Sequence, residues 1–176
     1  IDEAGILMAP IVKRTWAKAG ETPKIIHKTR SHKKISAIGA IAVRYTGNRA
    51  RLMFRLLEGQ NANSQIFVHF LNQLLQNING HIIVIWDRLV AHRSKIVKRW
   101  LEKNRRIETE FFPPYAPELN PVEYLWSYLK MNDLANLAAK DLEQLYCESK
   151  KSLCNIRKQK NILKSFIQHS PANFFN

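Results

Sequence analysis

The alternation of apolar and polar positions predicts three strands in the first third of the chain. Residues 1–9 are apolar around an acidic pair and are typical of the end of a strand. Residues 35–43 (ISAIGAIAV) and 51–57 (RLMFRLL) are also strand-like, and residues 45–48 between them carry a turn signal. The stretch 10–34 is basic and interrupted by proline and glycine, so we expect mainly loop or a short hairpin there.

Helical and strand-like patterns then alternate. Residues 63–78 show helical spacing through Ile66, Phe67, Phe70, Leu71, Leu74 and Leu75, and Asn79-Gly80 closes this helix. The continuous apolar run 81–86 (HIIVIW) predicts a buried parallel strand covered on both faces. A basic helix at 95–103 and a short strand at 107–112 follow.

The last third begins with a segment that cannot be regular structure, because prolines fix the backbone and remove donors at residues 113–117. Asn120 and Pro121 then predict the cap and first turn of a helix that carries residues 122–130. Residues 140–168 are mostly helical and strongly basic. Three strands followed by alternating helices and strands indicate an α/β fold with a mixed sheet.

Size and charge narrow the function. The 176 residues fit one domain of ordinary size, and 45% hydrophobic residues favour a folded chain. The 28 Lys and Arg residues outnumber the 14 Asp and Glu residues, which gives a net charge of +14. This excess favours a polyanionic partner such as nucleic acid over the alternative of a basic but unspecialised surface.

Other sequence features indicate the compartment. Cys147 and Cys154 have neither the spacing of a zinc site nor the number for a disulfide framework, and free thiols suit a reducing cytoplasm. No apolar run reaches transmembrane length and no signal peptide is recognisable, so we expect no membrane partner. The chain starts at Ile1 rather than Met, and we interpret it as a piece of a longer protein.

Three acids stand where active sites collect in α/β proteins. Asp2 ends an apolar stretch, Asp87 directly follows the predicted central strand, and Glu123 lies in the first turn of a helix. Each alone is also explained as a capping or surface acid. Together they suit hard cations, Mg²⁺ or Mn²⁺, of which two about 4 Å apart can clamp a phosphodiester.

Two segments resemble mariner-type DDE transposases, with the best match to their bacterial insertion-sequence branch. They are WDRLVAHRS at residues 86–94 and FPPYAPELNPVEYLW at residues 112–126, and residues 2–5, 14–17 and 20–23 are also similar to that family. The resemblance implies an RNase H-like fold, with three antiparallel strands, then parallel strands, and flanking helices. It further implies that Asp2, Asp87 and Glu123 are the catalytic triad and bind two Mg²⁺ ions.

The chain departs from the family pattern in three places. The second acid is followed by Arg88 where the family commonly has Asn, the first strand is truncated at Ile1, and the family's N-terminal helix-turn-helix region is absent. We divide the chain into a catalytic core at 1–132 and a basic C-terminal helical segment of the same domain at 133–176.

Several residues are candidates for contact with DNA. Trp16 lies among basic neighbours, Arg14 and Lys18, in a predicted loop. After the second acid come Arg88, His92, Arg93 and Lys95. His92 could contact a phosphate or a metal-bound water, or it could cap or pack the helix. Trp126 is expected in the core, and Glu3 is expected to face away from Asp2, because neighbours in a strand alternate faces.

The sequence thus predicts a transposase catalytic domain that cleaves DNA and transfers strands with divalent metal ions. The alternative from another class is a catalytically inactive DNA-binding remnant; a ribonuclease H is a weaker third reading, because the proline-rich motif belongs to the transposase pattern. The expected partners are transposon ends and target DNA, and the resemblance allows a homodimer of the full-length protein. The expected location is the bacterial cytoplasm, in association with DNA.

Overall fold

Two hydrogen-bonded sheets form the centre of the fold. In the first, β1 (Asp2–Leu7), β2 (Lys34–Val43) and β3 (Ala50–Glu58) are antiparallel, in that order. In the second, β4 (Ile82–Trp86) and β5 (Ile107–Phe111) are parallel. This computed structural model describes residues 1–26, 33–44 and 49–172, so the turn predicted at 45–48 lies outside the described residues.

The predicted single mixed sheet is thus divided into two. A hydrogen bond from the Ile1 nitrogen to the Ile85 carbonyl oxygen, 2.7 Å long, joins the two sheets. They also share one apolar core, to which β2 contributes Ile38 and β4 contributes Trp86. The strand directions are nevertheless those that were predicted, three antiparallel and two parallel.

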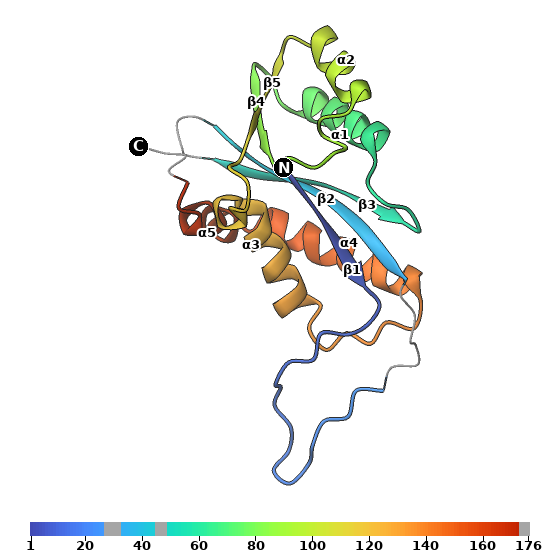
Figure 1. The fold of residues 1–176 in the computed structure, drawn as a ribbon. Coiled ribbons are helices and arrows are strands. Elements are labelled where there is room, and N and C mark those ends of the chain that lie inside the picture. Colours follow the sequence, from blue (N-terminus) through green and yellow to red (C-terminus); the bar gives the residue numbers. More distant parts are fainter. Residues whose placement is uncertain (27–32, 45–48, 173–176) are drawn as a thin grey trace.

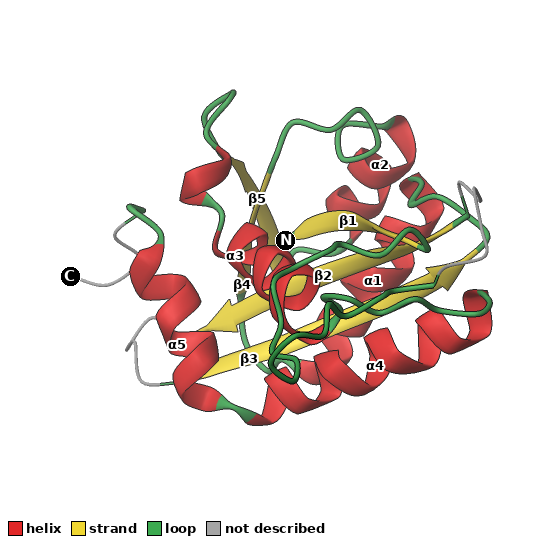
Figure 2. Cartoon of the chain, turned by 90° about the horizontal axis from the view of Figure 1, so that it is seen from below, coloured by secondary structure: helices red, strands yellow, loops and turns green. Residues whose placement is uncertain are grey.

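Helices lie on both sides of the layer of strands, as Figures 1 and 2 show. On one side lie α1 (Ser64–Asn77), capped by the Asn63 side chain, and α2 (Lys95–Lys103), capped by the Ser94 hydroxyl. On the other side lie α3 (Pro121–Tyr128), α4 (Leu142–Lys158) and α5 (Lys160–His169). The result is three layers, with strands between two layers of helices.

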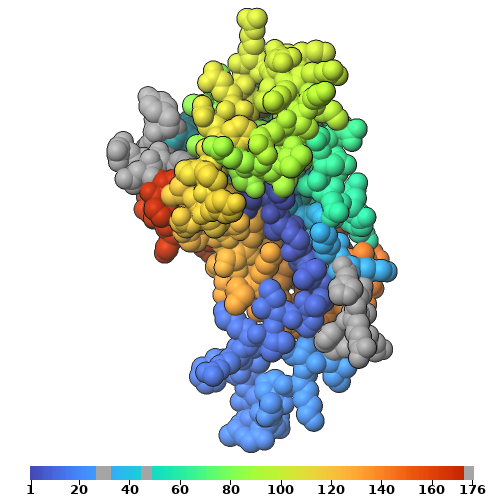
Figure 3. All heavy atoms as spheres, viewed as in Figure 1, coloured from blue at the N-terminus to red at the C-terminus, as the bar shows by residue number. Residues whose placement is uncertain are grey.

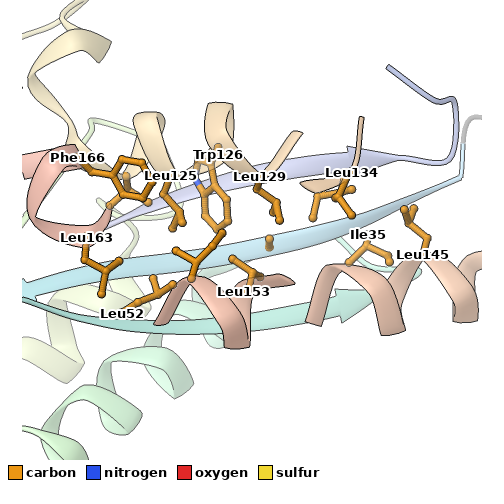
Figure 4. Packing of buried hydrophobic residues seen from close by; sticks show 14 of the residues in the cluster. Ile35, Leu52, Leu125, Trp126, Leu129, Leu134, Leu145, Leu153, Leu163 and Phe166 are labelled. Carbon is orange, nitrogen blue, oxygen red and sulfur yellow. The ribbon is translucent and has the colours of Figure 1, made fainter. Parts of the chain in front are cut away.

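Each layer boundary contains one apolar core. The core under α1 and α2 is built on Ile38, Phe67, Phe70, Trp86 and Val97, among others. The core on the opposite side joins the strands to α3, α4 and α5; Figure 4 labels Ile35, Leu52, Leu125, Trp126, Leu129, Leu134, Leu145, Leu153, Leu163 and Phe166 in it. The prediction that Trp126 belongs to the core is confirmed, since it is 2% exposed.

Strand β4 corrects one prediction. It is parallel to β5, as expected, but it is not covered on both faces: Ile82, Val84 and Trp86 are buried, whereas Ile83 is 61% exposed. The reason is that α1 and α2 both pack against the same face of this two-stranded sheet. An apolar run without polar alternation therefore does not guarantee burial on both sides.

The basic C-terminal region is helical, as predicted, but it is divided. Helix α4 ends at Lys158, the backbone of the next residue, Gln159, leaves the helical region at φ −91° and ψ 83°, and α5 starts at Lys160. Both helices contribute apolar side chains to the same core, α4 through Leu153 and Ile156 and α5 through Leu163 and Phe166. The break allows both to lie against the strands.

Two further segments connect these elements. A short 3₁₀ turn at Pro117–Leu119 precedes α3, and a π-helical turn at Leu129–Asp133 follows it. Residues 8–26 form a long loop without a strand ladder, joined to the rest by the bridge between Ile11 and Ala135. No helix in the described part of the chain is long and apolar enough to cross a membrane.

Gly39 couples the sheet to α3. It pairs with Asp2 across β1 and β2, and a Cβ there would lie 2.8 Å from Trp126 and 3.3 Å from Val122. We expect Gly39→Ala to lower the free energy of unfolding by roughly 1–3 kcal/mol, because overpacking forces α3 away from β2. Thermal unfolding measures this, with Gly5→Ala as the control.

The control is matched because a Cβ on Gly5 would meet only the Lys34 side chain, at an ordinary contact distance of 3.5 Å. Equal unfolding temperatures for the two variants would contradict the tight packing of α3 on β2.

Candidate active site

Three carboxylates from separate elements line one cleft. Asp2, Asp87 and Glu123 all border a cavity of about 530 Å³, together with Arg88, Asn120 and the proline-rich loop. The chain brings them together across 121 positions, since β1, the end of β4 and the start of α3 meet here. The convergence predicted from their positions at strand ends and a helix start is therefore present.

Local structure holds each acid in place. Asp2 is the first residue of β1 and pairs with Gly39 in the ladder. Asp87 follows β4 directly, and its Oδ1 accepts from the Leu89 amide at 3.0 Å. Glu123 lies in the first turn of α3, where Pro121 and the Asn120 side chain, which accepts from the Val122 amide, fix the helix start.

Asp2 is the acid whose charge is most costly. It is 6% exposed, and its Oδ2 is buried without a hydrogen-bond partner among the described residues. Burial, followed by repulsion from Glu123 and Glu3, raises the pKa of Asp2 to about 8. A buried carboxylate beside other acids is stabilised by a cation, so the site has the electrostatic character of a cation site.

This shift predicts that Asp2→Asn stabilises the metal-free domain at about pH 8. A carboxyl whose pKa is raised from 3.8 to about 8 binds its proton more tightly in the folded chain, so stability falls as pH rises between these values. At about pH 8, the unfolding temperature of Asp2→Asn should exceed that of the parent by roughly 2–4 °C for each kcal/mol of unfolding free energy gained. At about pH 4 the two unfolding temperatures should differ little.

Thermal unfolding in the presence of a chelator tests this, with Glu118→Gln as the control, since Glu118 is exposed and does not line the cleft. An Asp2→Asn variant that is no more stable than the parent at pH 8 would show that the buried charge costs little.

The donor set fits divalent cations through pairs of carboxylates. No group of three or more His, Cys, Asp or Glu residues in the described ranges is close enough, as placed, to hold one ion. Mg²⁺ usually takes one or two protein carboxylates and completes its shell with water and phosphate oxygens. Oxygen ligands on three acids around one cleft, with an unpartnered Asp2 oxygen, suit this mode of binding.

Behind the cleft lies a contact that the sequence did not indicate. His92 is 2% exposed, and its Nδ1 lies 2.9 Å from Asp87 Oδ1, while its Nε2 lies 3.8 Å from Glu3 Oε2. Glu3 does face away from Asp2, as predicted, but this places it beside His92. Burial, followed by repulsion from Asp87, raises the pKa of Glu3 to about 7, and burial lowers the pKa of His92.

The structure therefore changes the interpretation of His92. The ring is stacked on Trp86 at 4.3 Å and is in edge contact with Phe67 at 4.3 Å. This geometry favours the packing alternative for His92, whereas its contact with DNA stays a prediction. A spacing of five residues after the second acid was the one sequence signal for this contact.

The other candidate DNA-contacting residues are exposed. Arg88 borders the cleft, and Arg93 and Lys95 lie near the start of α2. Arg14, Trp16 and Lys18 lie on the long loop, where Trp16 is 99% exposed; this blue segment projects at the bottom of Figure 3. They are accessible, but they lie on two separate parts of the surface.

The cleft rim also carries a residue that the sequence analysis missed. Tyr115, within the proline-rich loop, is fully exposed and has a left-handed backbone with φ 58°. Such a conformation is uncommon for a bulky residue and is held here between Pro113-Pro114 and Pro117. The absence of regular structure predicted at 113–117 is confirmed for residues 113–116 and is wrong for Pro117, which begins the 3₁₀ turn.

Comparisons with known proteins identify the family. The family described as DDE superfamily endonuclease matches residues 1–146. The 39 kDa protein of insertion element IS630 from Shigella sonnei is 25% identical over 130 residues, which are 73% of this chain and 36% of that protein. The chain thus spans about a third of this curated relative.

Solved structures share the fold. The Mos1 mariner paired end complex with Mn superposes with a TM-score of 0.68 at 20% identity, covering 98% of this chain and 52% of that one. The catalytic domain of Mos1 mariner transposase gives a TM-score of 0.59 at 18% identity, covering 81% and 71%. The chain therefore belongs to the DDE superfamily endonuclease family and has the RNase H-like fold of the mariner transposase catalytic domain.

Proposed function

We propose that this chain is the catalytic core of a transposase that cleaves DNA and transfers strands with divalent metal ions. The observation that carries the proposal is the convergence of Asp2, Asp87 and Glu123 on one cleft in a chain of net charge +14. Membership of the DDE endonuclease family and the similarity to an insertion-element protein support it. The substrates would be transposon ends and target DNA.

The three acids would form the metal site. Two divalent ions held between pairs of these carboxylates would supply the charge that activates the attacking oxygen and stabilises the leaving oxygen. Mg²⁺ and Mn²⁺ both suit the oxygen ligands, and Mos1 structures were solved with each of these metals. Asp2 would be the buried ligand between the other two, since it is 6% exposed and its Oδ2 has no hydrogen-bond partner among the described residues.

The chemistry would take place in two stages. Attack of water on phosphorus at a transposon end breaks the phosphodiester and leaves a 3′-hydroxyl; attack of that hydroxyl on a target phosphodiester joins the strands. Arg88, on the cleft wall, would hold a phosphate without taking part in bond breaking. All three carboxylates line this cleft, so a DNA backbone laid along it would meet each of them.

The remaining surface would position DNA. Arg14, Trp16 and Lys18 on the loop, and Arg93 and Lys95 near the start of α2, are exposed and would contact the phosphate backbone or, for Trp16, a base. A homodimer of the full-length protein is part of the proposal, with the Mos1 paired end complex as the parallel.

We further propose that residues 1–132 form the catalytic core and residues 133–176 a helical segment of the same domain. The assignment of both segments to one domain is supported by a shared apolar core. Leu145 and Leu153 of α4 and Phe166 of α5 pack in it together with Leu52 and Trp126. The basic side chains of Lys150, Lys151, Lys158, Lys160 and Lys164 are exposed, as expected for a solvated helix face.

Nicking of a supercoiled plasmid by the purified chain tests the proposed function. We expect nicks in the presence of Mg²⁺ or Mn²⁺ and none when a chelator removes the divalent metal ions. DNA binding without any metal-dependent nicking would favour the alternative, a catalytically inactive remnant, and cleavage of RNA–DNA hybrids in preference to duplex DNA would favour a ribonuclease H.

A further inference from the structure

We propose that His92, braced by Glu3, is the positioning residue that orients the Asp87 carboxylate toward the cleft. This inference rests on the proposed function, because it assigns a role around the metal site. It starts from the chain of contacts Glu3–His92–Asp87, which joins β1 to the end of β4 behind the acidic cleft.

The first step is the contact with Asp87. Nδ1 of His92 lies 2.9 Å from Asp87 Oδ1 and 3.2 Å from the Asp87 carbonyl oxygen. Both partners are acceptors, so Nδ1 carries the hydrogen and donates it. Oδ1 also accepts from the Leu89 amide at 3.0 Å. With two donors on Oδ1, the rotation of the carboxylate is fixed and Oδ2 is left for the cleft.

The second step is that the ring itself cannot turn. It stacks on Trp86 with an interplanar angle of 6°, and Phe67 meets it edge-on at 83°. Its side chain is fully buried. Because the packed aromatic rings fix the orientation of the imidazole, the Nδ1–H bond also fixes the orientation of the Asp87 carboxylate. A solvent-exposed histidine, whose ring can rotate, would not do this.

The third step is the brace. His92 Nε2 and Glu3 Oε2 are both buried without a hydrogen-bond partner in the described part of the chain, and they face each other at 3.8 Å. At 3.8 Å they are too far apart for a hydrogen bond, and since Nδ1 carries the ring hydrogen, one forms only if the two atoms approach by about 1 Å with a proton between them. Burying two polar atoms without hydrogen-bond partners costs free energy unless the two interact with each other. We therefore interpret this contact as part of the site, in which Glu3 holds the far side of the His92 ring.

Metal-binding carboxylates and histidines in proteins are commonly oriented by such outer partners, whose loss costs about 10–100-fold in metal affinity or activity. The arrangement here is a carboxylate held by a histidine that is held by a second carboxylate. It explains why an imidazole lies buried behind an acidic cleft without access to it.

Substitutions of His92 can test the Nδ1 contact with Asp87 and the Nε2 contact with Glu3 separately. His92→Asn can place its amide nitrogen near the position of Nδ1 and donate to Asp87, whereas His92→Gln reaches toward the position of Nε2 and Glu3. His92→Phe keeps the aromatic stack and removes both nitrogens. Leu74→Ala is the packing control, because Leu74 is buried in the same core and lies on α1 about two turns beyond Phe67, the residue of α1 whose ring meets His92.

The readout is Mn²⁺ binding to the whole chain, followed by the electron paramagnetic resonance signal of free Mn²⁺, with thermal unfolding beside it. We expect His92→Phe to weaken Mn²⁺ binding about 10–100-fold and His92→Asn to stay within about threefold of the parent. Leu74→Ala should lower the unfolding temperature and leave Mn²⁺ binding within about threefold of the parent.

Two results would overturn the proposal: unchanged Mn²⁺ binding by His92→Phe, or a loss by His92→Asn as large as that of His92→Phe at equal stability. If His92→Phe does not fold, the comparison of His92→Asn with His92→Gln decides, since only the first keeps the donor to Asp87, and equal affinities would contradict the role. A parent chain that binds no Mn²⁺ and nicks no DNA would refute the proposed function instead.

Discussion

Asp87→Asn and Glu123→Gln are each expected to lower metal-dependent DNA cleavage by about 10²–10³-fold or more, the loss typical of removing one preorganised charge-stabilising group. Each substitution keeps the shape of the side chain and removes the charge that a metal ion requires. DNA binding should remain intact or become slightly tighter, because one negative charge facing a polyanion is lost.

Plasmid nicking measured beside gel-shift titrations separates the two effects. Glu118→Gln is the matched control, since it removes the same charge from the 3₁₀ turn just before α3, from a residue that does not line the cleft. Near-normal cutting by Asp87→Asn or Glu123→Gln would remove that acid from the site, and an equal loss in Glu118→Gln would show that net charge, not position, was responsible.

The chain is also expected to bind duplex DNA with little sequence preference and a steep dependence on salt. The excess of 14 positive charges is spread over the long loop, the region from Arg88 to Lys103 and the C-terminal helices, and charges arranged in this way contact phosphates. With roughly five phosphate contacts, each adding about 0.9 to the slope, affinity should fall about 10³-fold between about 50 and 200 mM salt.

Binding to two unrelated duplexes over this salt range measures both properties. Arg88→Gln, on the cleft wall, should reduce the slope by about 0.9, whereas Arg55→Gln, exposed on β3 outside these basic regions, should leave it unchanged. A flat salt response would remove the electrostatic argument. A strong preference for one duplex would mean that these residues contain an element that recognises bases.

The helices and strands could largely be predicted because their signals are local. The boundaries of α2 agree with the expectation, since Ser94 caps it and its basic face is solvated. Helix α3 starts where Asn120 and Pro121 indicated. The break at Gln159 could not be predicted, because the apolar positions on both sides of it fit one continuous helix; packing of α4 and α5 on one core decides it.

The sequence by itself determined the class of chemistry: three acids at strand ends and a helix start, a strong positive charge, and a proline-rich motif that resembles the transposase family. These depend on residue type and spacing along the chain. Only the tertiary structure decided that the acids share one cleft, that β4 is open on one face, and that His92 is buried between Asp87 and Glu3. The physical reason is that burial and proximity depend on how β1, β4 and α1 pack together, and residues 84 or more positions apart meet only when the layers have formed.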